Sequence, residues 1–422
     1  MILAHGQLYE DSALPELRDR LAAECGETIA RASIDSELVV AACDELARRT
    51  ARGDYDSVLS PFLTALHIDP AHFQTGLSLF RRESLRYKLA MELGPLDTPL
   101  RRPGLPPIRR ARYPLGVLLH IAAGNVDGLP AYSVVEGLLA GNINILKLPS
   151  MDHGASILLL KELTRLEPRL RDFVYVFDVP SADSQSLAAF AQAADGVVIW
   201  GGDGAVRAAR QLAAPDTRII AWGHKLSFAY AVPDAPDPEL ADLARHLCLT
   251  RQLLCSSCQG IFLDTTDMAE ITAFGERFFA LLQAENRRHP PADRSLRARA
   301  ALQLYNEELE AHLTGRRVLR AGGVSVTIAP DSELELSHLA GNCWVKPLPR
   351  ERIIPVLKRK KGYLQTAGLL CRPEDRAVLS GLLARAGLVR ITEPGEMSRT
   401  IPGEAHDGEY PLQAYSRIVE LS

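Results

Sequence analysis

The fold of this chain is decided by residues 115–150, which read LGVLLHIAAGNVDGLPAYSVVEGLLAGNINILKLPS. Residues 115–121 form an apolar run of strand length, and residues 122–130 contain glycine, asparagine and proline, which are typical of a turn. Residues 131–140 favour a helix closed by Gly141 and Asn142. Residues 143–150 read as a second strand, so the stretch predicts a strand–helix–strand unit and hence a parallel sheet.

Polar side chains stand at the predicted ends of these two strands. Asn125 follows the first strand, and Lys147 and Ser150 lie at the end of the second. Ligands of parallel sheets bind outside the carboxyl ends of the strands. We therefore expect these three residues to line a binding site.

The alternation of strands and helices continues through residue 222. Further strands are predicted at 173–178, 195–200 and 217–222, with helices at 182–192 and 205–213. Two glycine-containing turns follow the last two strands, at Gly201-Gly202-Asp203-Gly204 and at Gly223. Glycine lets a backbone approach a ligand at a helix N-terminus, where an anion is favoured. The first turn differs from the usual G-x-G-x-x-G dinucleotide pattern, and the Asp203 carboxylate would repel a nearby phosphate.

A second stretch carries candidate nucleophilic chemistry. Residues 251–262 read RQLLCSSCQGIF and contain Cys255 and Cys258. Cys255 precedes a predicted strand at 260–263, and a turn at a sheet edge places backbone N–H groups near such a thiol. Those groups favour the thiolate and also serve as oxyanion donors. A buried structural cysteine explains this stretch alone equally well.

Composition bounds the remaining possibilities. The chain has 422 residues, 47% hydrophobic and 24% charged, with a net charge of -4. This length predicts two or three domains, and the charge gives no electrostatic case for a nucleic-acid partner. We expect no membrane span and no signal peptide, because residues 1–11 lack a basic region followed by an apolar one. Seven scattered cysteines favour a reducing, cytoplasmic location, and their spacing predicts no metal site.

Together these features resemble a known superfamily. The Gly124-Asn125 turn, the Lys147-Leu148-Pro149-Ser150 strand end, the Gly-Gly-Asp-Gly turn, and Gly223-His224-Lys225 about thirty residues before Cys255 resemble the aldehyde dehydrogenases. Within that superfamily, roughly residues 100–420 resemble the LuxC family of fatty acyl-CoA reductases. The resemblance implies an α/β, aldehyde dehydrogenase-like fold with a Rossmann-like cofactor domain and an α/β catalytic domain.

The expected domain organisation has four parts. It comprises a helical region at 1–100, an NAD(P)-binding domain at 101–232, a catalytic domain at 233–395, and a tail at 396–422 that packs back or bridges subunits. The proline- and arginine-rich segment at 95–114 is expected to be an extended connector or an oligomerisation arm. The superfamily resemblance also implies a homo-oligomer.

The resemblance assigns roles to individual residues. It implies that Cys255 is the nucleophile, that Asn125 supplies the side-chain donor of the oxyanion hole, and that Lys147 holds the adenosine ribose of a nicotinamide cofactor. Gly201, Gly202 and Gly223 are expected to line the cofactor site. Ser150 stands where relatives carry a ribose-binding glutamate, and loss of that carboxylate favours NADPH, with NADH as the alternative. Cys258, where many relatives have proline, has no assigned role.

One departure indicates the reaction type. Oxidative relatives have a catalytic glutamate just before Gly-Gly-Lys, whereas this chain has Ala221-Trp222-Gly223-His224-Lys225. Without that general base, hydrolysis of a thioester intermediate should slow by roughly two to four orders of magnitude. The resemblance therefore implies NADPH-dependent reduction of an acyl thioester, from acyl-CoA or acyl carrier protein, to an aldehyde. The partner of the chain would then be this thioester. The basic run at 358–361 could contact its acidic groups, although such a run is more commonly a solvated surface.

Three alternatives remain open from the sequence. The first is a reductase of an acyl phosphate or a small CoA thioester on the same fold. The second is an inactive relative that still binds the cofactor. The third is a thiol–disulfide oxidoreductase that uses Cys255 and Cys258.

Overall fold

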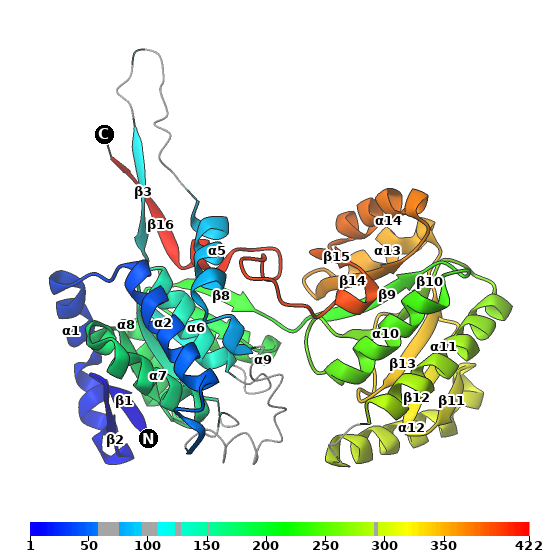
Figure 1. The fold of residues 1–422 in the computed structure, drawn as a ribbon, viewed down its shortest axis with the longest axis horizontal. Helices are drawn as coiled ribbons and strands as arrows, with labels where there is room; N and C mark the ends of the chain where they lie inside the picture. Colours follow the sequence, from blue (N-terminus) through cyan, green and yellow to red (C-terminus); the bar gives the residue numbers. More distant parts are fainter. Residues whose placement is uncertain are drawn as a thin grey trace. The chain divides into compact units, whose positions relative to one another are not determined.

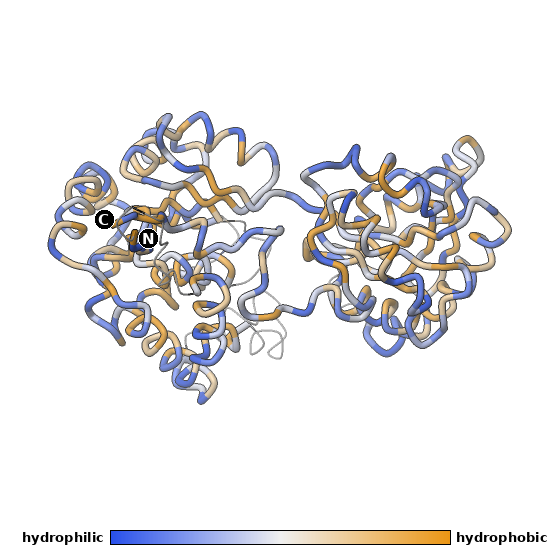
Figure 2. The backbone as a smooth tube through the Cα atoms, turned by 90° about the horizontal axis from the view of Figure 1, so that it is seen from above, coloured by the Kyte–Doolittle hydropathy of each residue, from blue (hydrophilic) through white to orange (hydrophobic). Residues whose placement is uncertain are grey.

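The computed structural model describes residues 1–57, 76–94, 104, 108–122, 128–149, 152, 154–290 and 294–421, with side chains left aside at 294–297 and 312. The chain divides into two compact units (Figure 1), Met1–Gly223 together with Ile401–Ser422, and His224–Thr400. Within each unit the hydrophobic segments concentrate in the interior and the hydrophilic segments in the outer turns (Figure 2).

A seven-stranded sheet organises the first unit, in the order β2-β1-β6-β5-β4-β7-β8. The strands are β1 (Ile2–Ala4), β2 (Gln7–Tyr9), β4 (Val117–Ile121), β5 (Ile143–Lys147), β6 (Val174–Phe177), β7 (Gly196–Trp200) and β8 (Arg218–Trp222). β6, β5, β4, β7 and β8 run parallel, and β1 pairs antiparallel with β6 and β2. Along the chain, β5 and β6 follow on one side of β4, and the chain then crosses back to place β7 and β8 on the other side. The reversal creates a topological switch point between β4 and β7.

Helices cover both faces of this sheet. They are α1 (Leu14–Arg31), α2 (Ser36–Ala51), α5 (Arg82–Leu93), α6 (Leu129–Leu139), α7 (Ala155–Leu166), α8 (Ser184–Ala193) and α9 (Asp203–Leu212), with short 3-10 helices η1 (Asp11–Ala13) and η2 (Pro168–Phe173). Side chains cap the N-termini of some of these helices. The Asp183 carboxylate accepts a hydrogen bond from the Ser186 N–H at 3.0 Å at the start of α8, which satisfies a donor that the helix leaves unpaired.

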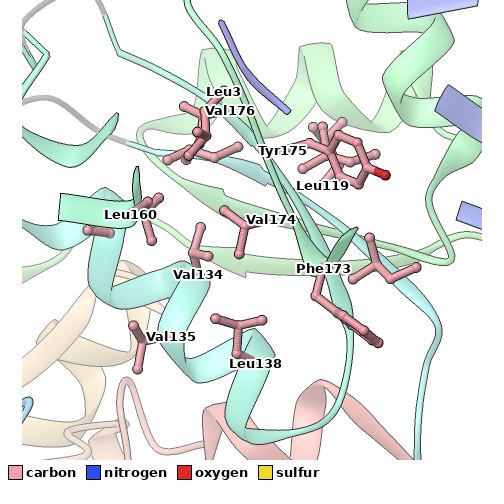
Figure 3. Packing of buried hydrophobic residues seen from close by; sticks show 14 of the residues in the cluster. Leu3, Leu119, Val134, Val135, Leu138, Leu160, Phe173, Val174, Tyr175 and Val176 are labelled. Atoms are coloured by element: carbon pink, nitrogen blue, oxygen red, sulfur yellow. The ribbon is translucent and has the colours of Figure 1, made fainter. Parts of the chain in front are cut away.

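The core beside α6 shows why residues 131–140 form a helix (Figure 3). Val134 and Leu138 of α6 and Leu160 of α7 pack near Val174 of β6, and each side chain is at most 1% exposed. The α6 side chains recur at the three- and four-residue spacing that places them on one helix face. Each buried aliphatic side chain of this kind contributes about 1.5–3 kcal/mol.

A second seven-stranded sheet organises the other unit, in the order β11-β12-β13-β10-β9-β14-β15. The strands are β9 (Leu226–Ala231), β10 (Cys258–Leu263), β11 (Arg317–Ala321), β12 (Val324–Ile328), β13 (Asn342–Pro347), β14 (Leu364–Leu370) and β15 (Arg390–Thr392). β11 pairs antiparallel with β12 at one edge, and the other neighbouring strands are parallel.

Five α-helices belong to this second unit. They are α10 (Asp237–Thr250), α11 (Met268–Arg288), α12 (Arg294–Thr314), α13 (Ile353–Leu357) and α14 (Pro373–Ala386), with 3-10 helices η3 (Arg350–Arg352), η4 (Lys358–Lys360) and η5 (Pro394–Glu396). One hydrophobic cluster includes residues of α10 and α11, and another includes residues of α13 and α14. Strands of the sheet contribute to both clusters, so the central strands are buried on both faces.

A two-stranded ribbon joins distant parts of the sequence. β3 (Arg109–Pro114) pairs antiparallel with β16 (Ser416–Leu421), from Arg109 opposite Leu421 to Pro114 opposite Ser416 (Figure 1). The short helix α15 (Pro411–Ala414) precedes β16, and its Leu412 N–H donates to the buried Glu92 carboxylate at 2.8 Å. The tail therefore packs against the first unit.

The predicted strands and helices of residues 115–222 are confirmed within a few residues. β1, β2 and β9 were not predicted. β9 is buried along its whole length, so it lacks the alternation that marks a half-exposed strand. Among the described helices, none has both the length and the apolar character needed to cross a membrane.

Candidate functional site

Cys255 lies on an exposed turn between α10 and β10. α10 ends at Thr250, and the next two residues, Arg251 and Gln252, adopt left-handed backbone conformations with φ of 54° and 62°. Such conformations cost free energy for residues other than glycine, and they persist where surrounding contacts fix them. The strained pair turns the chain sharply before the cysteine.

The side chain of Gln252 supplies those fixing contacts. It is 2% exposed, and its Nε2 donates to the carbonyl oxygens of Cys258 and Asn342, each at 3.0 Å. Its Oε1 accepts from the Gly341 N–H at 3.0 Å, and the Ala340 N–H donates to the Arg251 carbonyl at 3.2 Å. The turn before Cys255 is thus fastened to the segment that enters β13.

Two further side chains hold Cys255 itself. The Ser227 hydroxyl of β9 donates to the Cys255 carbonyl oxygen at 2.7 Å and accepts from the Thr366 N–H at 3.1 Å. The Gln365 amide of β14 places Nε2 3.3 Å from Cys255 Sγ. A donor at this distance stabilises a thiolate more than a neutral thiol, which suits a nucleophile.

These contacts place the thiol at the amino edge of its sheet. Ser227 and Gln365 are each the second residue of their strands, and Cys255 precedes β10. The cofactor residues of the first unit were expected at carboxyl ends, so the two groups of predicted residues occupy opposite kinds of sheet edge. This placement follows from the sharp turn after α10.

Cys258 has a different environment from Cys255. It is fully buried, its Sγ donates to the Gly260 carbonyl at 3.2 Å, and burial raises the pKa of its thiol to about 12. A thiol with such a pKa is a poor partner for thiol–disulfide exchange. The environment therefore argues against the thiol–disulfide alternative.

The carboxyl edge of the first sheet carries Lys147. The side chain leaves the last residue of β5 and is 6% exposed, and its Nζ donates to the Ser181 hydroxyl at 3.0 Å. Burial lowers the pKa of Lys147, and the carboxylate of Asp178 partly offsets this effect. Such an ammonium, held near the switch point, is suited to bind a hydroxyl or phosphate group.

The three predicted glycines lie at the same kind of edge, after β7 and β8. A Cβ on Gly201 would come within 3.2 Å of the Ala205 Cβ, whereas a Cβ on Gly202 or Gly223 would meet nothing within 4 Å. A side chain at 201 would therefore be tightly packed against Ala205, and the open space at 202 and 223 leaves room for a ligand. Asp203 lies in the first turn of α9, which follows Gly202.

Aromatic side chains enclose a histidine beside these turns. The His406 ring lies edge-on to Trp200, the last residue of β7, at 4.8 Å between centroids, and to Trp222, the last residue of β8, at 5.0 Å. His120, by contrast, is fully buried and bonded to Ser133 and Asn144, and burial lowers its pKa to about 4. This environment is that of a structural histidine.

Two predicted site residues, Asn125 and Ser150, lie outside the described residues. Sequence analysis missed Gln252, Ser227 and Gln365, because glutamine and serine carry no motif and their partners are remote in sequence. Within the described ranges, no three His, Cys, Asp or Glu side chains gather as they would to hold a metal ion.

The family described as acyl-CoA reductase (LuxC) matches residues 33–418. The chain belongs to this family. The match confirms the resemblance found in the sequence and extends it beyond residue 100 toward the N-terminus.

Two curated proteins are similar in sequence to this member of the LuxC family. A long-chain acyl-protein thioester reductase of Photorhabdus luminescens is 27% identical over 312 residues, which are 71% of this chain and 62% of that protein. The protein of the same name from Aliivibrio fischeri is 25% identical over 320 residues, 72% of this chain and 64% of that protein. The chain thus spans somewhat under two thirds of the length of these relatives.

Solved structures establish the aldehyde dehydrogenase-like fold of the family member. Bifunctional proline utilization A matches 98% of this chain with 45% of its own, at a TM-score of 0.75 and 16% identity. Aldehyde dehydrogenase 21 from Physcomitrella patens matches 97% of this chain with 90% of its own, at a TM-score of 0.72 and 13% identity. These likenesses confirm the predicted α/β fold class.

Proposed function

We propose that this chain reduces an acyl thioester to an aldehyde through a covalent intermediate on Cys255. The observation that carries the proposal is the environment of this thiol. Of the seven cysteines, all within the described residues, Cys255 alone is exposed, and a side-chain amide donates to its sulfur. Family membership and the relatives' names as thioester reductases support the same substrate class.

In the proposed first step, the Cys255 thiolate attacks the thioester carbonyl. The new C–S bond forms as the carbonyl becomes an oxyanion, which the Cys255 backbone N–H and the Asn125 side-chain amide are proposed to stabilise. Collapse breaks the original C–S bond, and the leaving thiolate takes a proton. Thiol exchange is nearly thermoneutral, so the site needs orientation more than a strong base.

The end of β8 supports reduction rather than hydrolysis of this intermediate. Ala221 and Trp222 occupy the end of the strand, where oxidative relatives place the glutamate that activates water. Without that carboxylate, water should attack the acyl-enzyme roughly two to four orders of magnitude more slowly. The acyl group then persists long enough to be reduced.

A nicotinamide cofactor would supply the hydride for that reduction. The first unit offers residues that fit one: Lys147 at the end of β5 for a ribose, and open backbone at Gly202 and Gly223 beside the switch point. Gly201 completes the turn before α9. We propose NADPH rather than NADH, because Ser150 brings no carboxylate that would repel a 2′-phosphate.

Several broader expectations remain part of this proposal. The first unit would bind the cofactor, the second would supply the nucleophile, and the substrate would be an acyl-CoA or an acylated carrier protein. The ribbon of β3 and β16 would serve as an oligomerisation arm in a homo-oligomer. Seven free thiols favour a reducing compartment such as the cytoplasm.

The decisive experiment follows NADPH oxidation with acyl-CoAs of graded chain length. Wild-type protein should consume NADPH only when a thioester is present, and Cys255→Ala should abolish this turnover. In the absence of NADPH, intact-protein mass spectrometry should show one acyl group on wild-type protein and none on Cys255→Ala.

Cys371→Ala is the matched control, because Cys371 is the partly exposed thiol of the same unit and lies outside the proposed site. It should retain both activities. Turnover that survives Cys255→Ala would remove the covalent route, and binding of NADPH with no turnover of any thioester would indicate an inactive relative.

A further inference from the structure

A run of basic residues lies beside the candidate nucleophile. Residues 358–361 form η4 and the turn that leads into β14, and we call this segment the basic turn. Lys358, Arg359 and Lys361 are exposed, and none of the three forms an ion pair within the described part of the chain. Lys360 instead pairs with Glu333 at 2.6 Å. The turn therefore carries an excess of positive charge.

A second segment of the chain, just before β9, adds to this charge. The Lys225 ammonium donates to the Gly362 carbonyl at 2.9 Å, directly after the basic turn. The turn is also held in place by the backbone, since the Leu226 N–H donates to the Tyr363 carbonyl at 2.6 Å. Cations from two separate segments thus converge at the start of β9 and β14.

The basic turn lies a few residues before the side chain that contacts the candidate nucleophile. β14 begins at Leu364, and its second residue, Gln365, is the one whose amide reaches Cys255 Sγ. Gln365 is four positions after Lys361, so their Cα atoms lie at most about 14 Å apart. The basic turn and the thiol therefore share the amino edge of one sheet.

The thioester substrates of the proposed function carry negative charge at a matching place. In coenzyme A and in carrier proteins, the thiol belongs to a pantetheine arm whose far end is phosphorylated. Lysine and arginine side chains commonly bind phosphate in proteins. The lysine ammonium acts as a point charge, and the planar arginine guanidinium donates two parallel hydrogen bonds. A thioester placed at Cys255 would extend this phosphorylated end along the edge where the basic turn lies.

We propose that the basic turn, together with Lys225, binds the phosphate of a phosphopantetheine thioester while its acyl carbon meets Cys255. This inference rests on the proposed function for the identity of the reacting atoms. It assigns these cations a role in substrate recognition that is independent of the acyl chain. It also predicts that these cations do not affect kcat/KM for a thioester that has no phosphate.

The test compares two thioesters of the same acyl group, one on coenzyme A and one on N-acetylcysteamine, which has no phosphate. The variant Lys358→Gln/Lys361→Gln should lower kcat/KM for acyl-CoA at least tenfold. It should leave kcat/KM for the N-acetylcysteamine thioester within twofold of wild type. Raising ionic strength should weaken acyl-CoA turnover in the wild type and have less effect on the variant, because salt screens exposed charges.

The control is Arg287→Gln/Arg385→Gln, which removes two exposed positive charges from α11 and α14 of the same unit. It should leave both substrates unaffected, and the KM for NADPH should be unchanged in either variant. Equal loss with the two thioesters, or no loss with acyl-CoA, would overturn the proposal. An acyl carrier protein carries the same phosphate, so a larger loss with acylated carrier protein than with acyl-CoA would identify the carrier as its source.

A binding measurement separates this proposal from the proposed function. Calorimetric titration of free coenzyme A into Cys255→Ala needs no turnover. Adding Lys358→Gln/Lys361→Gln to that protein should weaken binding at least tenfold, while the affinity for unphosphorylated pantetheine stays the same. Coenzyme A that binds both proteins equally would refute the phosphate site even if the wild type proves to be a reductase.

Discussion

Gln365 Nε2 lies 3.3 Å from Cys255 Sγ, although 110 residues separate the two in sequence. We expect Gln365→Met, which keeps the length of the side chain and removes its donor, to slow alkylation of Cys255 by iodoacetamide near neutral pH. The pH midpoint of alkylation should move upward by about one unit, since a hydrogen bond to a charged group contributes about 1.5–3 kcal/mol. Mass spectrometry of the alkylated peptide checks this expectation.

Gln365→Glu tests the same contact with a negative charge in place of the amide donor. A carboxylate beside the sulfur would disfavour the thiolate by repulsion, so its midpoint should rise further than that of Gln365→Met. Identical alkylation profiles in all three proteins would show that the amide has no influence on the thiol.

Gln252 should matter for stability as well as for reactivity. Gln252→Leu would leave the Gly341 N–H and two buried carbonyl oxygens without their side-chain partner. At about 1–3 kcal/mol for an unsatisfied buried group, we expect the free energy of unfolding to fall by roughly 3 kcal/mol. Urea denaturation measures this, and Gln252→Glu, which buries a carboxylate against the two carbonyl oxygens, should be destabilised at least as much as Gln252→Leu.

The buried histidine His246 should make the second unit sensitive to acid. Burial lowers its pKa to about 4, with a small opposing effect from Glu396, and its Nε2 accepts from the Cys258 N–H at 3.5 Å. The histidine is therefore neutral in the folded state but becomes protonated on unfolding below about pH 6.5. Stability is fully present above that pH and is lost as the pH falls toward 4, by up to about 1.4 kcal/mol per unit.

His246→Gln keeps an acceptor and cannot titrate. The pH dependence of unfolding between about pH 6 and 4.5 should be shallower by about one proton. His120→Asn, in the first unit, should flatten the unfolding of that unit instead, because burial lowers its pKa to about 4 as well. An unchanged slope in either variant would contradict the assignment of a neutral buried histidine.

Removing the lysine from the buried ion pairs of Lys88 should lower the free energy of unfolding strongly, and removing a carboxylate as well should lower it less. Lys88 Nζ lies 2.6 Å from Glu92 and 2.8 Å from Glu136, and all three side chains are buried. Burial opposes the charge on Lys88, but the carboxylates of Glu136 and Glu92 outweigh it and raise the pKa. Lys88→Met should therefore destabilise the chain by about 3–5 kcal/mol, because it leaves uncompensated carboxylates.

Adding Glu136→Gln to Lys88→Met should recover part of that loss in urea denaturation. Equal stability of the single and double variants would mean that Glu136 does not sense the lysine charge.

The fold was predictable where local pattern and tertiary environment agree. The apolar runs at 115–121 and 143–147 form central parallel strands, which are buried on both faces and therefore consist mainly of apolar residues. β9 escaped prediction because its short, uniformly buried run follows a glycine turn and has no periodicity of its own. The ribbon of β3 and β16 depends on pairing across three hundred residues, which no local pattern contains.

The candidate site divides in the same way. Cys255 and Cys258 differ little in local composition, whereas the fold exposes the first thiol and buries the second. Gln252 and Gln365 act through partners 89 and 110 residues away, respectively. Such long-range contacts are invisible to spacing, so the thiol could be proposed from sequence but its supporting side chains could not.

The discontinuity of the first unit has a consequence for biosynthesis. A ribosome makes residues 1–223 first, then the whole of His224–Thr400, and only afterwards the segment that contributes α15 and β16 to the earlier unit. At about 5–20 residues per second, the interval lasts roughly 10–35 s. During it the nascent chain holds β3 without its partner strand and Glu92 without the Leu412 N–H. The second unit, which carries Cys255, is therefore made in full before the first unit can be completed. The strand edge of β3 stays unpaired during this time and is exposed to chaperones or to a neighbouring nascent copy.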